Sequence, residues 1–234
     1  MLVLLSGCGG DSSADAGLTQ SVSLEPQSKH IKALFFGTGP YAYPNKPGCP
    51  GARDRWVSFP VGSIVEVVVP AETTDEDYQF VVEEMDKINT AVAGYFTTIV
   101  VQSDKSDLNN PQENQITFNF VNRDGMKKYC GNADGGGCID MKFQSGGKYL
   151  IKSGKSFYPV ARGIFDVHEI GHGIGLCHVN QQAFPEGTMA SAGVSNGVIP
   201  RFSDSELTAI HFVYTSGMAV GSTEQEFWDA GLLP

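Results

Sequence analysis

The chain has 234 residues, of which 41% are hydrophobic and 18% charged, and its formal net charge is −10. This length suits one domain with short appendages, and the apolar content excludes a chain that is disordered throughout. The acidic balance argues against a nucleic-acid partner, which would require a basic face to bind phosphates. We therefore expect a globular, monomeric protein.

The chain begins MLVLLSGCGGDSSADAG, an apolar run that leads into Leu5-Ser6-Gly7-Cys8 and then a polar tract. Residues 1–8 resemble the lipobox of bacterial lipoproteins, which implies lipidation of Cys8; an ordinary signal-peptide end is the alternative. The apolar run spans only about five residues, whereas a secretory signal needs ~7–15, so we expect a truncated signal peptide. Gly9 after the cysteine implies, by the same resemblance, the outer membrane of a Gram-negative bacterium. The lipid would be the only membrane attachment, because no other segment can span a bilayer.

Residues 9–29 are rich in Ser, Asp, Gly and Gln and predict a flexible tether. The domain then covers residues 30–234, with its core at about 60–217. The apolar stretch HIKALFFGTG (30–39) is expected to be a strand, and residues 40–54, rich in Pro and Gly, a loop.

The middle of the chain alternates strand and helix patterns. Runs rich in β-branched and aromatic residues predict strands at 63–70, 96–102, 116–121 and 147–153. Residues 73–96 predict a helix capped by Thr74 or Asp75, because apolar residues recur at helical spacing. Its stripe is Tyr78, Val81, Val82, Met85, Ile88 and Val92. This order of elements predicts an α/β layout.

The C-terminal part predicts three helices. The segment YPVARGIFDVHEIGHGIG is expected to be helical from near Pro159, with a stripe toward the sheet formed by Ile164, Val167, Gly171 and Ile174. Gly171 and Gly173 would permit close packing, since a glycine inside a helix is otherwise costly. A second helix would begin after the cap Ser203 and end at Gly217. A short last helix is expected over TEQEFWDAG.

The stretch FDVHEIGHGIGLCHVN (165–180) contains three of the five histidines. His168 and His172 are four residues apart, so a helix places both rings on one face within reach of one metal ion. Glu169 points elsewhere and can act as a base beside a metal-bound water. Gly175 can take a left-handed conformation that turns the chain and returns His178 as a third ligand. Three nitrogens plus one water form the open site of a catalytic zinc.

The complete pattern H-E-x-x-H-x-x-G-x-x-H resembles that of the metzincin clan of zinc endopeptidases. GTMASAG places Met189 eleven residues after His178, where that clan has its Met-turn. FSDSELTAIHFVYTSG is similar to the C-terminal helix of matrixins, and HEIGH to the HEIGH-type bacterial metallopeptidases. The resemblance implies an α+β zincin fold, with a twisted mixed sheet, an active-site helix and a C-terminal helix. It also implies one catalytic Zn²⁺.

Three residues depart from the better-known members of the clan. Ser191 stands where astacins and serralysins carry a tyrosine that approaches the zinc, so a tyrosine switch is not expected. Val179, after the third histidine, matches none of the familiar subfamilies, and Cys177 before that histidine is unusual.

Of the five cysteines, four remain when Cys8 is set aside, and in an exported chain they predict two disulfides with three possible connectivities. Cys130 and Cys138 flank the flexible GNADGGG, which favours their pairing and leaves Cys49 with Cys177. A cysteine-rich zinc site is the alternative, but C-x-x-C spacing is absent. Two other hypotheses remain: a Cys177 thiolate that competes for zinc, and a Cys49 that acts as the latency cysteine of matrixin prodomains, to which PGCPGARD is weakly similar.

Together these features predict a zinc-dependent endopeptidase with Glu169 as general base. Its substrate would be an extended peptide that pairs with an exposed sheet edge at residues 147–152, and its S1′ pocket would be walled between His178 and the C-terminal helix. The alternatives are a metal-dependent hydrolase of a non-protein amide or cell-wall peptide, and an inactive zinc-binding surface module. Calcium at residues 134–137 is unsupported, because alternating oxygen ligands are lacking.

Overall fold

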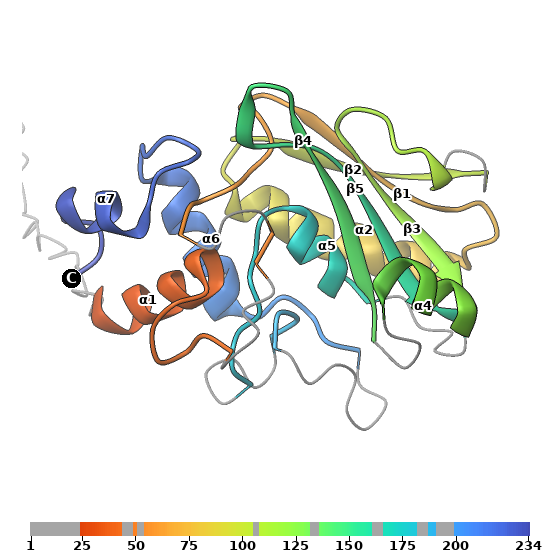
Figure 1. Cartoon of the computed structure of the whole chain (residues 1–234), viewed down its shortest axis with the longest axis horizontal. Coiled ribbons are helices and arrows are strands. Elements are labelled where there is room, and N and C mark those ends of the chain that lie inside the picture. The colour runs from red at the N-terminus through yellow and green to blue at the C-terminus, as the bar shows by residue number, and fades with distance from the viewer. Residues whose placement is uncertain are drawn as a thin grey trace, which may run out of the picture.

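The computed structural model describes residues 24–43, 49–50, 54–104, 108–131, 136–160, 166–181, 187–190 and 199–234. These residues form a mixed α/β structure around one five-stranded sheet (Figure 1). The described part of the chain contains no helix with the length and apolar character needed to cross a membrane.

Four strands of the sheet are parallel, and the fifth, at one edge, is antiparallel. In spatial order they are β2 (Thr97–Ser103), β1 (Ile64–Pro70), β3 (Gln115–Val121), β5 (Gly147–Pro159) and β4 (Cys138–Gln144). The three strands predicted at 63–70, 96–102 and 116–121 are confirmed. The fourth is longer than predicted, since β5 continues to Pro159, and β4 was not predicted.

The prediction that residues 147–152 form an exposed edge is wrong. This part of β5 pairs with β4 on one side, and on the other it meets Ser58. The Ser58 amide donates to the Tyr149 carbonyl at 3.1 Å, and the Ile151 amide donates to the Ser58 carbonyl at 2.8 Å. The edge next to the histidine segment is therefore β4.

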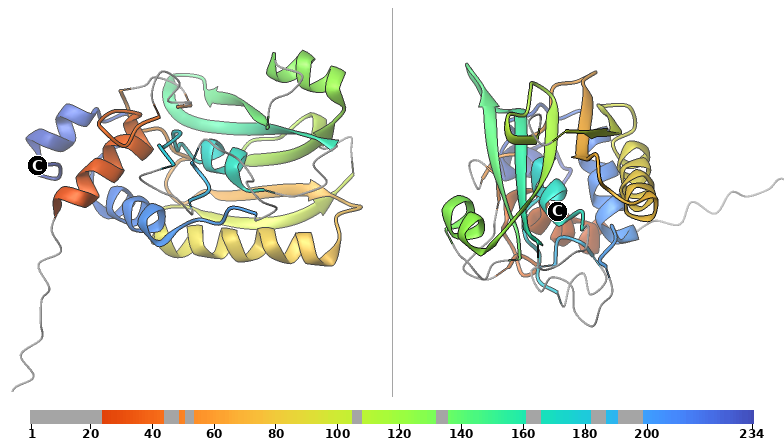
Figure 2. Two further views of the ribbon diagram at one scale, coloured as in Figure 1. Left: turned by 90° about the horizontal axis from the view of Figure 1, so that it is seen from below. Right: turned by 90° about the vertical axis from the view of Figure 1, so that its right-hand side faces the viewer.

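Two helices pack on one face of the sheet, α2 (Asp75–Ala91) and the short α5 (His168–Gly173), while α4 (Arg123–Cys130) lies on the other (Figure 2). The Thr74 hydroxyl accepts from the Asp77 amide at 3.2 Å, which confirms Thr74 as the cap of α2. Because α5 lies beside β4 and β5, the sheet edge and the histidine helix border one another.

The helices predicted at the C-terminus are confirmed as α6 (Asp204–Thr215) and α7 (Glu224–Asp229). Ser203 caps α6 in a reciprocal capping box with Glu206. Trp56 packs edge-on against Tyr214 of α6 and Phe227 of α7. These helices therefore share the core with the segment that precedes β1.

The strand predicted at 30–39 is wrong. Residues 24–36 instead form α1 (Leu24–Ile31) and one π-helical stretch, η1 (Lys32–Phe36), which ends at Gly37 with φ 63°. Every residue from Ala33 to Phe36 is buried. Because this short run contains no polar residues, its hydrophobic pattern shows neither the spacing of a helix nor that of a strand. The helix α1 packs on α6, so the predicted tether is helical from residue 24 on; Cys8 and residues 9–23 lie outside the described residues.

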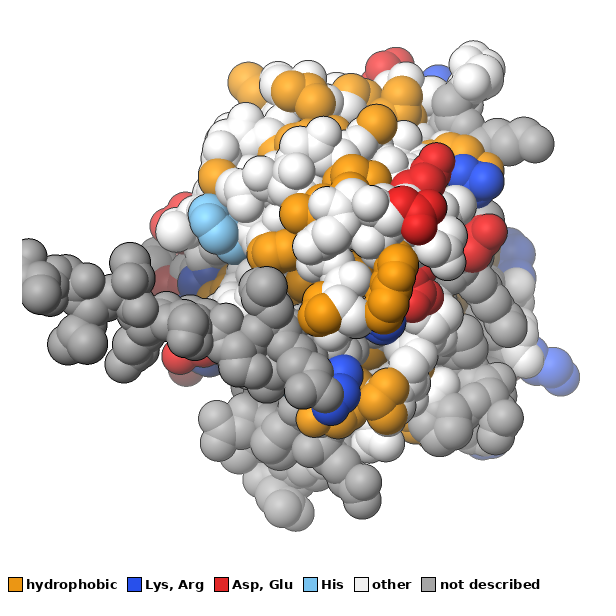
Figure 3. Space-filling view, turned by 90° about the vertical axis from the view of Figure 1, so that its left-hand side faces the viewer, with side chains coloured by type: hydrophobic (Ala, Val, Ile, Leu, Met, Phe, Trp, Pro, Cys, Tyr) orange, Lys and Arg blue, Asp and Glu red, His pale blue; other side chains and the backbone are white. Residues whose placement is uncertain are grey.

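Figure 3 shows the side of the molecule that carries α1 and α7. The hydrophobic side chains visible there reach the surface in several separate groups between polar and charged ones. Among the described large apolar residues, one of the more exposed is Trp228 of α7, whose ring lies under the Lys32 ammonium at 4.7 Å. The contact joins α7 to η1.

Candidate metal centre

Three histidine rings converge on the face of the sheet that carries α5. His168 and His172 come from successive turns of α5, and His178 comes from the segment that follows the helix. The Nε2 atom of His178 lies 3.0 Å from that of His168 and 2.9 Å from that of His172. Within the described residues, these histidines form the one group of three or more His, Cys, Asp or Glu side chains gathered closely enough to hold a metal ion.

The hydrogen bonds of two rings fix which nitrogen faces the centre. His168 Nδ1 lies 2.6 Å from the Thr188 carbonyl oxygen, and His172 Nδ1 lies 2.7 Å from that of Leu176. A carbonyl oxygen only accepts, so each Nδ1 carries the hydrogen and each Nε2 has a free lone pair. Burial, helped by the two neighbouring histidines, lowers the pKa of His172 well below its usual value, which keeps the ring neutral.

This donor set fits one metal ion. Two nitrogens that each bind zinc at ~2.0–2.1 Å lie no further apart than about twice that distance, and the measured Nε2 separations satisfy this. The three-histidine group can therefore hold a metal ion.

Gly175 turns the chain between the second and third histidines. Its φ is 105°, and a Cβ added there would collide with the Val57 carbonyl oxygen. The turn is closed by hydrogen bonds from the Gly175 amide to the His172 carbonyl and from the Leu176 amide to the Gly171 carbonyl, both at 2.9 Å. The backbone at this point has room only for glycine, and the turn sets the path to His178.

We expect Gly175→Ala to destabilise the fold and to lower metal affinity. Overpacking alone costs about 1–3 kcal/mol, and the positive φ adds to it. Gly217→Ala is the matched control, because Gly217 also has a positive φ of 78° but a Cβ there meets nothing within 4 Å. Thermal denaturation of both variants checks this. Equal losses of stability in the two variants would show that the contact with Val57 has no effect.

The helix α5 is shorter than predicted and is oriented differently. Pro159 ends β5 instead of starting a helix, because the aromatic run before it continues the sheet, and Ile164 lies outside the described residues. Gly171 does not face the sheet, since a Cβ there would overlap the Met189 sulfur. Gly173 is the residue that faces the sheet, with β3 and β4 side chains against it. The two glycines let the helix approach Met189 on one side and the sheet on the other.

His178 lies in a short extended segment with neighbours on both sides. Val179 forms a bridge to Ala42 on one side and to Ala190 on the other. The Val179 amide donates to the Met189 carbonyl at 3.0 Å, and the Tyr43 ring packs edge-on against the His178 ring at 6.2 Å. Residues near the N-terminus and residues after the centre thus fix the third histidine from opposite sides.

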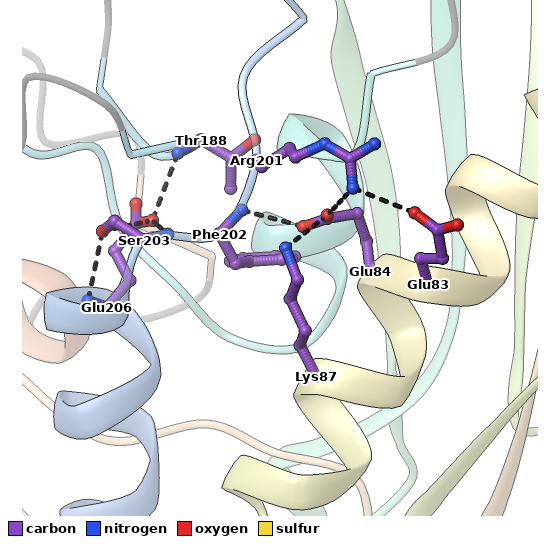
Figure 4. A network of polar contacts seen from close by, with 8 residues as sticks. All are labelled: Glu83, Glu84, Lys87, Thr188, Arg201, Phe202, Ser203 and Glu206. Atoms are coloured by element: carbon purple, nitrogen blue, oxygen red, sulfur yellow. Dashed lines mark hydrogen bonds and ion pairs between the residues drawn. The ribbon is translucent and has the colours of Figure 1, made fainter.

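The turn that contains Met189 is anchored by a buried carboxylate on α6. The Glu206 carboxylate accepts from the Met189 amide at 2.8 Å. It also accepts from the Thr188 amide at 3.2 Å and from the Ser203 amide at 2.8 Å (Figure 4). Burial raises the pKa of Glu206, and the three amides oppose that rise. The sequence carried a signal for this residue, since Ser203-x-x-Glu206 matches a capping box.

A second buried carboxylate, Glu84 of α2, anchors the segment that leads into α6 (Figure 4). It accepts from the Phe202 amide at 2.9 Å, and the Arg201 guanidinium and the Lys87 ammonium lie at 3.1 and 2.7 Å. Glu84 is fully buried. The sequence could have indicated this burial, because Glu84 lies on the apolar face of α2 between Val81 and Ile88.

A pocket of about 440 Å³ opens beside the histidines. Glu169, His172 and His178 contribute to its lining. The other lining residues are Cys49, Pro50, Gly137, Cys138, Ile139, Met141 and Phe143. Gly137 lies against the Glu169 side chain, since a Cβ built on it would be 2.6 Å from Glu169 Oε1. Glu169 is 5% exposed and is not one of the three convergent ligands, so its carboxylate borders the pocket as a candidate base.

Both predicted disulfides are confirmed, Cys130–Cys138 and Cys49–Cys177. Each contributes one cysteine, Cys138 or Cys49, to the wall of the pocket. The hypotheses of a Cys177 thiolate and of Cys49 as a zinc ligand are therefore wrong for this structure, because both sulfurs are oxidised.

We expect the double variant Cys49→Ser/Cys177→Ser to lose about 2–4 kcal/mol of stability, because this bridge closes a long loop with a sequence separation of 128. The corresponding variant of Cys130 and Cys138, whose separation is 8, should lose less. Urea denaturation of both variants measures the difference. An equal or larger loss for the short loop would contradict the prediction.

Some predicted features lie outside the described residues. Ser191 and most of the expected S1′ wall are among them, as are residues 134 and 135 of the segment 134–137 considered for calcium. Residues 187–190 of the predicted Met-turn are described, and Met189 among them lies directly against Gly171 of α5.

Comparison with known proteins assigns no family to this chain. No family model matches it, no curated protein is significantly similar to it, and no solved structure matches it. What the centre can do follows from its own residues and their geometry.

Proposed function

We propose that the protein is a zinc-dependent endopeptidase of the metzincin type. One observation supports this most strongly: three imidazole nitrogens converge, and the buried Glu169 lines the same pocket without joining them. Three histidine ligands leave a tetrahedral ion with one open position, as in catalytic rather than structural zinc sites. The five-stranded sheet with α5 beneath it and α6 at the C-terminus is compatible with a metzincin-like fold.

The chemistry is divided between the ion and the chain. The three histidines would hold a zinc ion, which would supply Lewis-acid chemistry by lowering the pKa of a bound water toward ~7 and polarising the carbonyl of the substrate. Glu169 accepts the proton of the attacking water and delivers it to the leaving amine. The carbonyls of Thr188 and Leu176 hold the imidazoles of His168 and His172 in the tautomer that keeps Nε2 available.

The substrate backbone would pair with β4 instead of residues 147–152. The strand β4 is an edge of the sheet, and Ile139, Met141 and Phe143 on it line the pocket that contains Glu169. An extended peptide added to this edge gains main-chain hydrogen bonds and brings a peptide bond near the centre.

Hydrolysis by the purified full-length chain tests the proposal. The chain should cleave casein and unblocked as well as end-blocked peptides after zinc loading, lose activity with a chelator and regain it when zinc is restored. Cleavage of end-blocked peptides distinguishes an endopeptidase from an enzyme that requires a free terminus. Zinc-loaded protein that cleaves only a cell-wall peptide amide would favour the other hydrolase, and protein that cleaves neither would favour an inactive binding module.

We also propose that the chain is an exported lipoprotein attached through Cys8 to the outer membrane. The two disulfides are compatible with an oxidising compartment. Expressed in a Gram-negative host behind a complete signal sequence, the protein should incorporate labelled palmitate and fractionate with the outer membrane. Cys8→Ser should abolish the label. A wild-type protein without label would exclude the anchor and leave the peptidase proposal unaffected.

A further inference from the structure

The pocket beside the centre is lined by residues of two chemical kinds. Glu169, His172 and His178 are polar, and the other lining residues bear no charged side chain. A volume of about 440 Å³ lies within the ~300–1,000 Å³ typical of ligand pockets, so it offers more room than a peptide bond alone requires.

One wall of the pocket belongs to β4. Ile139, Met141 and Phe143 alternate with the exposed Asp140 and Lys142, so the strand turns its apolar face to the pocket and its charged face to solvent. The side chain of Ile139 is wedged against Gly154 and Gly173 and belongs to the core. Met141 and Phe143 are half-buried, and they are the side chains on this wall that remain available to a ligand.

Cys49 and Pro50 also line the pocket, and they come from a distant part of the sequence. The bond from Cys49 to Cys177 attaches this segment next to the third histidine. The Cys177 amide also donates to the Leu34 carbonyl at 2.7 Å, so the attachment point is itself held to η1. This part of the lining is thus fixed covalently, and its nonpolar residues cannot compensate a charge.

We propose that this pocket is a subsite for an apolar side chain, aliphatic or aromatic, of a substrate residue next to the cleaved bond, with Met141 and Phe143 as the specificity-determining residues. The inference rests on the proposed function. A charged side chain in the pocket loses its hydration and finds no opposite charge among the apolar lining, so the site discriminates against it.

The test compares peptides that differ only in carrying Leu or Asp at each position around the bond. For the zinc-loaded full chain, kcat/KM should favour Leu by about tenfold or more at one position. Met141→Lys should reduce that Leu-to-Asp ratio by about tenfold, because the ammonium group attracts the carboxylate. Phe143→Ala, which introduces no charge, should raise KM for the Leu peptide more than it lowers kcat.

Ile99→Lys is the matched control, since it places the same charge on β2 at the opposite edge of the sheet, where Ile99 is 41% exposed. It should leave the ratio unchanged, and every variant should bind one zinc ion. An unchanged ratio in Met141→Lys would overturn the subsite while the peptidase stands.

Binding of uncleavable reduced-amide versions of the two peptides separates the two proposals. Tighter binding of the Leu peptide, weakened by Met141→Lys, supports the subsite even if wild-type protein cleaves nothing, an outcome that defeats only the proposed function. Equal binding of the two peptides would overturn the subsite.

Discussion

Glu169→Gln should lower kcat for peptide hydrolysis by about 10²–10⁴-fold, the range expected when a general base is removed. The amide keeps the shape of the carboxylate beside Gly137, so the buried position should tolerate it. Bound zinc should remain at one ion per chain, because Glu169 is not among the three convergent donors. Steady-state kinetics and elemental analysis of the same preparation check both parts.

The comparison of activity with metal content decides the role of Glu169. A fall in zinc content parallel to the fall in activity would make Glu169 a ligand, and unchanged activity would remove it from the chemistry. Glu66→Gln serves as the control. Glu66 lies on β1, where its carboxylate accepts a hydrogen bond from the Gln115 side chain at 2.7 Å, and it does not line the pocket.

His178→Ala should abolish both zinc binding and activity. It leaves two of three protein ligands, so the loss of affinity should exceed the ~10–100-fold that follows removal of an outer-shell partner. Competition with a chromogenic chelator measures the affinity. His211→Ala is the control, because His211 lies on α6 and its ring contacts the Ala91 carbonyl at the end of α2.

Retained zinc affinity in His178→Ala would show that a different residue completes the site. Calorimetry adds a further check: His178→Ala without zinc should unfold at nearly the temperature of the zinc-free wild type, since the main-chain bridges of the next residue, Val179, to Ala42 and Ala190 do not depend on the ring.

The parts of the structure that the sequence predicted are those governed by local rules. Thr74 and Ser203 cap α2 and α6 because a hydroxyl before a helical run satisfies free amides. The spacing of His168, His172 and His178 predicted a cluster, because helix geometry and one glycine turn determine where these rings lie. The pairing of the cysteines followed from the short loop that one pair flanks.

The parts that were missed depend on partners far away in the sequence. Residues 32–36 form a π-helical stretch that packs on Tyr214 of α6 through Phe35 and accepts a hydrogen bond from the Cys177 amide, and their own apolar run cannot reveal these distant partners. Glu84 is a buried charge only because Phe202 and Arg201 come back to it. The strand β4 was missed although Ile139, Met141 and Phe143 alternate with charged residues, a pattern typical of an edge strand.

The central claim is that three histidine nitrogens, and no sulfur, hold one zinc ion. X-ray absorption spectroscopy of the zinc-loaded full-length chain, with the zinc content measured on the same sample, tests it most directly. We expect one zinc per chain with three nitrogen neighbours at ~2.0–2.1 Å and one further oxygen. A sulfur neighbour at ~2.3 Å, or a chain that binds no zinc, would contradict the account.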